Sequence, residues 1–222
     1  MAIHAQQLRK IYKIGDQTIK ALDGVSLDIG DGEYVTVIGA SGSGKSTLMN
    51  ILGCLDTPTE GSYYLDGRDV SKLSDSSLSE IRSREIGFIF QSFNLIPSLT
   101  ALENVELPLL YRRIPKKQRS DTALTALECV KLSDRALHRP MELSGGQQQR
   151  VAIARAIAAD PGIILADEPC GNLDSKSGAE VLNILSELNE KGKTVIMITH
   201  NEETARRAKR LIRISDGKIV DG

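Results

Sequence analysis

A glycine-rich segment followed by lysine and serine is the strongest chemical pattern in the sequence. Residues Gly39–Ser46 read Gly-Ala-Ser-Gly-Ser-Gly-Lys-Ser and lie between a predicted strand and a predicted helix. Glycines let successive backbone N–H groups point at phosphate oxygens, and the start of a helix adds its positive end. Lys45 would bind the β- and γ-phosphates, and the Ser46 hydroxyl could ligate Mg²⁺. The segment therefore predicts a phosphate-binding site.

A second pattern places two carboxylates after an apolar run. Ile163–Ala166 is continuously apolar, and Asp167 and Glu168 follow it directly. A strand of this kind brings both acids to the carboxyl edge of a sheet, beside the phosphate-binding segment. There Asp167 could hold Mg²⁺, directly or through water, and Glu168 could polarise an attacking water. The alternative is that both acids only cap the turn after the strand.

Both patterns need a parallel sheet to position them, and the hydrophobic pattern predicts one. Apolar runs at Ile163–Ala166 and Val195–Ile198, joined by a helix of about 16 residues, are typical of strands buried on both faces. Further strands are predicted at His4–Tyr12, Val25–Ile29, Tyr34–Ile38, Ser62–Leu65 and Ile86–Phe90, and helices at Thr47–Leu55 and, from a capping pattern at Ser77 and Glu80, through Arg84. The expected fold class is α/β.

The middle third of the chain, residues 91–159, differs from the rest. Its apolar residues recur with helical spacing. Thr100 and Glu103 form a capping pattern that opens one helix, and Pro108 and Pro115 are expected to limit its extent. We therefore expect a helical insertion within an α/β core.

The composition is that of an ordinary globular protein. Of 222 residues, 41% are hydrophobic, and 28 basic against 29 acidic residues give a net charge of −1. This balance excludes binding driven by bulk positive charge. No apolar run approaches the roughly 18 residues that cross a bilayer, and the first nine residues lack an apolar signal core. We expect one large domain in the cytoplasm.

The pentapeptide Leu143–Gln147, Leu-Ser-Gly-Gly-Gln, points to a family. It lies between Lys45 and Asp167 in the order typical of ATP-binding cassette (ABC) ATPases, and the resemblance covers essentially the whole chain. The pentapeptide also has a local interpretation, because Ser144 and Gln147 form a capping box for the following helix. Both can hold, since a capped helix start with two glycines is also an anion site.

The resemblance implies a fold and an assembly. The fold is a P-loop NTPase core of residues 1–90 and 160–222, with an N-terminal antiparallel β subdomain and a helical subdomain at 91–159, so that 1–222 is one ABC ATPase domain. ABC ATPases bind ATP between two subunits arranged head to tail. A homodimer in the ATP-bound state is therefore expected, with ATP and Mg²⁺ as its ligands.

The resemblance also assigns roles to single residues. Tyr12 matches the aromatic residue that stacks on adenine, and Asp174 lies in the D-loop that links the two sites. The expected catalytic residues are Glu168, the Q-loop glutamine Gln91 and the switch histidine His200. Further nucleotide contacts are implied for Gly39, Ser41, Gly42, Ser43, Gly44, Lys45, Ser46 and Thr47 of one subunit and for Ser144, Gly145, Gly146 and Gln147 of the other, and metal contacts for Ser46, Gln91 and Asp167.

One residue departs from the family pattern. Cys170 stands where a threonine commonly follows Asp-Glu-Pro. Because the two side chains are similar in size, ATP binding is expected to survive. Since Glu168 is present, the resemblance implies turnover rather than a nucleotide-trapped cassette.

Within the family, Asn94–Pro97 and Glu103–Pro108, followed by Leu143–Arg150, resemble the branch that includes LolD, MacB and FtsE. The resemblance implies that ATP drives an integral membrane permease, an export-type or mechanotransmitting partner for lipoprotein release, macrolide or peptide efflux, or a similar task. It also implies a position on the inner face of the cell membrane. The basic run Arg112–Arg119 is either a solvated turn and helix start or a docking element for anionic lipid or an acidic permease loop. The alternative function is a soluble ABC ATPase that acts on nucleic acid or ribosomes. No coiled-coil insertion and no second cassette supports it, so no nucleic-acid partner is expected.

Overall fold

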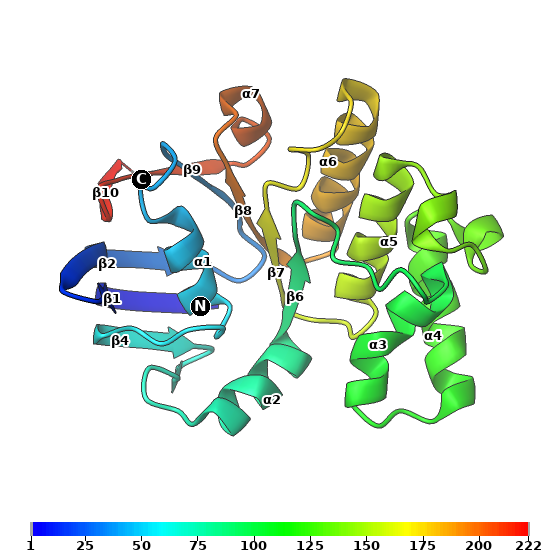
Figure 1. Cartoon of the computed structure of the whole chain (residues 1–222), viewed down its shortest axis with the longest axis horizontal. Helices are drawn as coiled ribbons and strands as arrows, with labels where there is room; N and C mark the ends of the chain where they lie inside the picture. Colours follow the sequence, from blue (N-terminus) through cyan, green and yellow to red (C-terminus); the bar gives the residue numbers. More distant parts are fainter. Residues whose placement is uncertain (1, 222) are drawn as a thin grey trace.

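The computed structural model describes residues 2–221, which form two sheets flanked by helices (Figure 1). The first sheet is antiparallel, with the order β2-β1-β4-β5: β1 is Ile3–Ile14, β2 Gln17–Ile29, β4 Glu60–Leu65 and β5 Arg68–Asp69. The second has the order β10-β9-β3-β8-β7-β6: β3 is Tyr34–Ile38, β6 Ile86–Ile89, β7 Ile163–Asp167, β8 Thr194–Thr199, β9 Arg210–Ser215 and β10 Lys218–Asp221. It is parallel from β9 to β6, and β10 pairs antiparallel with β9.

The central strands are buried on both faces of the second sheet. Leu165 and Ile196 pack into one hydrophobic core, which also contains the antiparallel sheet. Their neighbours Ile164 and Met197 pack into a second core on the opposite face. This alternation explains why both strands read as continuous apolar runs, and it confirms the predicted parallel sheet.

The helices divide between the two cores. Side chains of α1 (Lys45–Leu52) and α2 (Asp75–Glu85) pack into the first core, and those of α3 (Ala101–Tyr111), α4 (Lys116–Cys129), α5 (Gly145–Ile157) and α6 (Ser175–Glu190) into the second. Two short 3₁₀ turns, Ser133–Arg135 and Pro140–Glu142, precede α5, and α7 is Glu202–Ala205. In Figure 1, α3, α4 and α5 lie together on the side of the molecule opposite the antiparallel sheet. Among the described residues, no helix combines the length and apolarity needed to cross a membrane.

Two predicted helix ends are wrong. The cap of α2 is Ser74 rather than Ser77, and the Ser74 hydroxyl accepts a hydrogen bond from the backbone N–H of Ser77. Pro108 lies inside α3 instead of ending it. A proline there removes one helical hydrogen bond, but the buried side chains of Val105 and Leu109 hold the helix against the second core. The predicted capping box at the start of α3 is confirmed.

Candidate nucleotide-binding site

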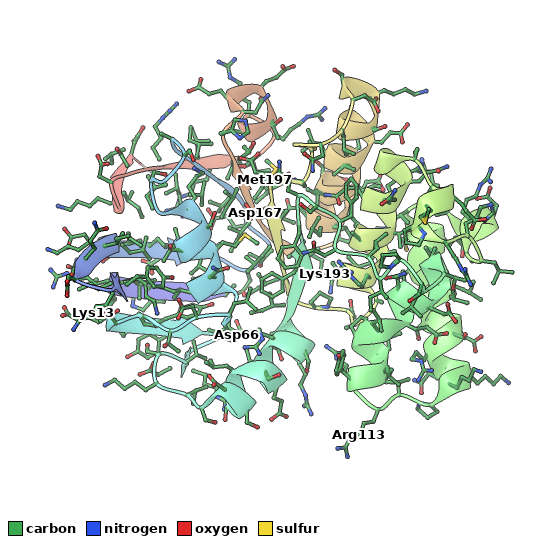
Figure 2. The ribbon with its side chains drawn as sticks, in the orientation of Figure 1. Lys13, Asp66, Arg113, Asp167, Lys193 and Met197 are labelled. Carbon is green, nitrogen blue, oxygen red and sulfur yellow. The ribbon has the colours of Figure 1, made fainter. Side chains whose placement is uncertain are left out.

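Four predicted site segments meet at one edge of the six-stranded sheet. Since β3, β8, β7 and β6 are parallel, the segments that follow them lie at the same edge. The glycine-rich loop follows β3, His200 follows β8, and Gln91 lies just beyond β6. Asp167 ends β7, and Figure 2 labels it near the middle of the molecule.

The glycine-rich loop leaves the start of α1 open. Gly44 has φ 105°, and a Cβ there would lie 2.5 Å from the backbone oxygen of Ala21, so no other residue fits. No side chain caps α1 at this position. The first N–H groups of the helix are therefore available to an anion.

Lys45 lies folded over this loop. Its Nζ donates to the backbone oxygens of Gly39 at 2.8 Å and Ala40 at 2.7 Å, and the residue is only 8% exposed. The hydroxyl of Ser43 is buried and has no hydrogen-bond partner among the described residues. A buried ammonium and an unpaired hydroxyl beside an open helix start fit the phosphate groups of a nucleotide.

The carboxylate of Glu168 is held from two sides. Its Oε1 accepts from the backbone N–H of His200 at 2.8 Å and lies 2.6 Å from His200 Nδ1. Its Oε2 accepts from the hydroxyl of Thr199 at 3.0 Å. Glu168 itself has φ 46°, a strained conformation for a non-glycine residue. Strain and three partners together fix the position of a candidate general base.

Asp167 lies in a less polar setting than its neighbour. Burial, and then the negative charge of Glu168, raise the pKa of Asp167, while the ammonium of Lys45 acts in the opposite direction. The interaction with Lys45 joins the acidic pair to the glycine-rich loop. A partly buried carboxylate at this position suits a divalent cation, which would compensate its charge.

Tyr12 lies near α1 with its hydroxyl fixed. The phenol donates to Asp56 Oδ2 at 2.8 Å, and Lys10 Nζ donates to Asp56 Oδ1 at 2.5 Å. Burial and the bond to Asp56 raise the pKa of Tyr12, and the hydroxyl of Thr47 on α1 lowers it. The interaction with Thr47 brings the aromatic ring close to the helix that carries Lys45.

Gln91 is joined to the segment that precedes α6. Its Nε2 donates to Asn172 Oδ1 at 3.3 Å, and Asn172 Nδ2 donates to the backbone oxygen of Gln91 at 3.1 Å. Asp174, two residues further, caps α6 by accepting hydrogen bonds from Ser177, which lower the pKa of Asp174. The Q-loop and D-loop residues are therefore neighbours within one chain.

The Ser144–Gln147 segment lies apart from the glycine-rich loop. Ser144 and Gln147 form the predicted capping box at the start of α5. A Cβ on Gly146 would lie 2.6 Å from Ser177 Oγ, so this glycine allows α5 and α6 to approach closely. Because α1 packs on one face of the sheet and α5 on the other, the structure does not bring the starts of these two helices together within one chain.

The sequence patterns missed several polar residues that hold the site together. Gln149 is fully buried on α5, where its Nε2 donates to the backbone oxygen of Pro169 at 2.7 Å. Arg155, also on α5, donates to two backbone oxygens just beyond Gln91, and burial lowers the pKa of Arg155. The available signal for Gln149 is a polar residue one turn before the fully buried Ile153.

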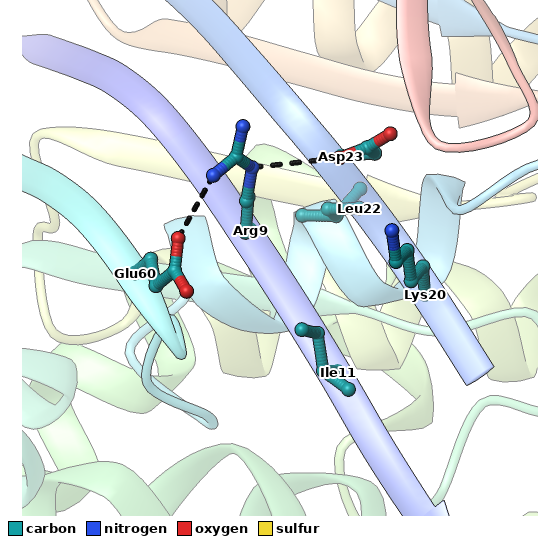
Figure 3. Close-up of a pocket in the computed structure, with 6 residues that line it drawn as sticks. All are labelled: Arg9, Ile11, Lys20, Leu22, Asp23 and Glu60. Carbon is teal, nitrogen blue, oxygen red and sulfur yellow. Dashed lines mark hydrogen bonds and ion pairs between the residues drawn. The ribbon is translucent and has the colours of Figure 1, made fainter. Parts of the chain in front are cut away.

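A hollow on the antiparallel sheet lies outside this site (Figure 3). Arg9 on β1 donates to Glu60 on β4 at 2.9 Å and lies 3.4 Å from Asp23 on β2. The hydrogen bond and charge of Glu60 raise the pKa of Arg9, in keeping with this pairing. The ion pairs link three strands and indicate a structural role.

Comparison with known proteins agrees with this geometry. The family model described as ABC transporter matches residues 22–171. An uncharacterized ABC transporter ATP-binding protein of Thermotoga maritima is 56% identical over 210 residues, which cover 95% of this chain and 90% of that protein. The macrolide export ATP-binding/permease protein MacB of Brucella melitensis is 55% identical over 98% of this chain, which spans only 34% of MacB.

A solved structure agrees in fold as well as in sequence. The dimeric structure of a post-hydrolysis ATP-binding cassette, bound to ADP and Pi, superposes with a TM-score of 0.91 at 49% identity and covers 99% of this chain and 97% of its own. The family model, the relatives and the shared fold lead to one conclusion: the chain belongs to the ABC transporter family, as one of its ATP-binding cassettes.

Proposed function

We propose that the chain is the ATP-binding and ATP-hydrolysing subunit of an ABC transporter, which dimerises on ATP and drives a membrane-embedded permease. One observation carries this proposal: the Lys45 loop, the Asp167–Glu168 pair and His200 converge on one edge of the parallel sheet. This edge offers positive groups for phosphates, an acidic pair and a histidine that already contacts the acid. The arrangement suits hydrolysis of a phosphoanhydride bond.

Each group has a distinct role in the proposed reaction. Lys45 and the N–H groups at the start of α1 bind the β- and γ-phosphates, and Tyr12 stacks on the adenine. Glu168 accepts hydrogen bonds from an attacking water and polarises it. His200 exchanges its bond to Glu168 for the γ-phosphate, which frees Oε1 for the water. Mg²⁺, held by Ser46, Gln91 and Asp167, would neutralise phosphate charge.

The second half of the site comes from a second copy. The start of α5 offers a capped helix end and two glycines, yet it lies on the other face of the sheet from Lys45. A head-to-tail dimer would bring Ser144–Gln147 of one subunit to the ATP of the other. The dimeric cassette bound to ADP and Pi, to which this chain is similar, supports this assembly.

The proposed permease contact lies where residues 91–159 meet the rest of the chain. A groove of about 1470 Å³ runs between α2 and the end of α3, lined in part by Leu55, Phe88 and Tyr111. Most residues that line the groove are polar or charged, and Leu55 (48% exposed) and Tyr111 (82% exposed) add apolar contacts for a cytoplasmic segment of the partner. MacB, whose name joins ATP-binding and permease functions, supports a membrane partner and a position on the inner membrane face.

The basic run beside this groove is partly structural. The guanidinium of Arg112 donates to the backbone oxygens of Ser83, Arg84 and Ala159, and Arg119 pairs with Glu106 at 2.9 Å. The exposed basic residues of the run are Arg113, which Figure 2 labels at the edge of the molecule, Lys116 and Lys117. These three would carry any attraction to anionic lipid.

Replacing Glu168 tests the proposal directly. Glu168→Gln keeps the size of the side chain but cannot accept a proton, so steady-state phosphate release should fall about 10²-fold or more. The variant should still bind ATP and should shift from monomer to dimer on a sizing column, because the closed state is no longer resolved by hydrolysis. A variant as active as the parent would remove Glu168 from this role, and one that stays monomeric in saturating ATP would refute the ATP-driven dimer.

A further inference from the structure

The loop that carries Gln91 is fastened to α5 by one arginine. Phe93 and Asn94 both lie in the left-handed region, with φ 60° and 51°. Two successive residues of this conformation turn their carbonyl oxygens to the same side. Arg155 takes both: Nη2 donates to Phe93 O at 2.8 Å and Nη1 to Asn94 O. A guanidinium suits this arrangement because its donors form a rigid fork.

A second side chain of α5 holds the beginning of the same loop. Gln149 Nε2 donates to the backbone oxygen of Phe90 at 3.3 Å and to that of Pro169 at 2.7 Å. Phe90 lies directly before Gln91, and Pro169 directly after Glu168. Gln149 and Arg155 therefore hold the Q-loop, residues 90–94, on both sides of Gln91, and both belong to the helix that begins at Gly145.

From these contacts we infer that Arg155 is a positioning residue, which couples Gln91 to the Ser144–Gln147 segment through α5. The inference rests on the proposed function, in which Gln91 contacts Mg²⁺ and the attacking water. Because α5 is a continuous helix, a shift of the Q-loop is passed to the helix start that faces the second subunit. The coupling also acts in the other direction: when the start of α5 contacts the partner's ATP, α5 fixes Gln91 in place.

Arg112, which directly follows α3, offers a matched control for Arg155. Arg112 also donates to backbone oxygens of distant segments, those of Ser83, Arg84 and Ala159, and so fastens α3 to the elements around it. None of these three carbonyl groups belongs to the Q-loop. Arg112→Met and Arg155→Met thus remove the same guanidinium chemistry, and only the second releases the loop.

A double-mutant cycle with Gln91 tests the coupling. Arg155→Met should lower kcat for phosphate release about tenfold in the parent but less than about twofold in a Gln91→Ala background, because the residue acts through Gln91. Arg112→Met should have the same effect in both backgrounds. Arg155→Lys, which keeps the charge but lacks the fork, should lie between parent and Arg155→Met. ATP affinity of the monomer, measured calorimetrically, should stay within about twofold for Arg155→Met.

The outcomes separate the inference from the function beneath it. The inference alone would be overturned if Gln91→Ala lowers kcat and Arg155→Met lowers it a further tenfold in that background. The inference would also be overturned if the effect of Arg112→Met on kcat depends on Gln91 as strongly as that of Arg155→Met. Such a result would indicate a general loss of rigidity in the protein. A Gln91→Ala chain that hydrolyses ATP at the parental rate would overturn the inference together with the role proposed for Gln91.

Discussion

Single residues in this protein are held by partners far away in the sequence. Asp56 shows the pattern: it accepts hydrogen bonds from Lys10 and from the phenol of Tyr12, and so links β1 to the segment after α1. Partial burial raises the pKa of Asp56, but the hydrogen bonds from Lys10 and Tyr12 outweigh burial, and the net pKa lies below its usual value. The ionised form of Asp56 therefore stabilises the fold.

Asp56→Asn is expected to destabilise the protein in a pH-dependent way. At pH 7 the loss should be about 1 kcal/mol, because bonds to a charged group at a half-exposed site are lost. The folded pKa lies below the unfolded one, so stability from Asp56 is complete above the unfolded pKa and is lost as pH falls through the folded value. Urea denaturation of parent and variant should therefore converge in acid.

The control for Asp56 is Asp134, an exposed acid that does not link distant segments of the chain. Asp134 pairs only with its neighbour Arg135 among the described contacts, and its side chain is 72% exposed. Asp134→Asn should change the free energy of unfolding by less than about 0.5 kcal/mol at every pH. A gap between Asp56→Asn and parent that stays constant from neutral to acidic pH would contradict the assignment. The KM for ATP should rise in Asp56→Asn, since the phenol of Tyr12 then donates to a neutral amide and is held less firmly.

At this scale the sequence predicts residues whose chemistry is local. The Ser144 capping box and the place of Gly39–Ser46 between a strand and a helix are predicted correctly, because both depend on residues a few positions apart. Arg155 and Phe93 are 62 positions apart, and the partners of Arg155 are carbonyl groups, which every residue possesses. No pattern of side chains marks such a bond, so these residues could be found only from the structure.

At the scale of elements, loops here are ordered by side chains that replace regular hydrogen bonds. Asn104, fully buried on α3, accepts from the backbone N–H of Ile96 and donates to the backbone oxygens of Ile96, Leu99 and Thr100. The side-chain amide of Asn104 thus provides hydrogen-bond partners for several backbone groups in the segment that precedes α3. The loop needs no strand or helix of its own to hold its shape.

Asn104→Ala should cost more than the loss of an ordinary helix cap. We expect about 2–4 kcal/mol of unfolding free energy, because several buried backbone groups lose their partner. Thr100→Ala, which removes only the cap of the same helix, should cost about 1 kcal/mol. Equal losses in urea denaturation would show that Asn104 does not order the loop. Amide exchange at residues 96–100 should quicken only in Asn104→Ala.

The misplaced start of α2 shows why element ends are harder to predict than elements. Ser74 and Ser77 are both chemically able to cap a helix, and Glu80 makes the later pattern look complete. In the structure the backbone N–H of Ser77 donates to the Ser74 hydroxyl, so Ser77 lies inside the helix and Ser74 caps it. The central strands β3, β7 and β8 are predicted well because burial on both faces leaves a mark on almost every residue of the strand. The less buried strands are not: only Val25–Ile29 of β2 is predicted, and no range is predicted for β5, β9 or β10.

At the scale of the whole molecule, the chain carries two helix starts that the proposed function assigns to two different ATP sites. The start of α1 and the start of α5 are both suited to phosphate, yet they pack on opposite faces of one sheet. The fold class and its helical block follow from hydrophobic periodicity. The position of the two half-sites follows only from the strand order, which periodicity does not contain.

Two defective chains should therefore restore each other. Lys45→Ala removes the phosphate-binding lysine, and Gly145→Asp places a negative charge at the start of α5, where a Cβ meets nothing closer than 3.7 Å. Each variant alone should be nearly inactive. An equal mixture should regain about a quarter of the parental phosphate release, because half of the dimers are mixed and each has one intact site. A mixture no more active than its components would exclude the head-to-tail arrangement.

Placing the two helix starts on opposite faces also affects how activity depends on concentration. If a second copy completes each ATP site, as proposed, a lone chain holding ATP must meet another copy before it can turn over. In dilute solution the rate should grow with the square of protein concentration. A permease that holds two cassettes side by side would remove this dependence by keeping their local concentration high. ATP hydrolysis would then be confined to cassettes assembled on their permease.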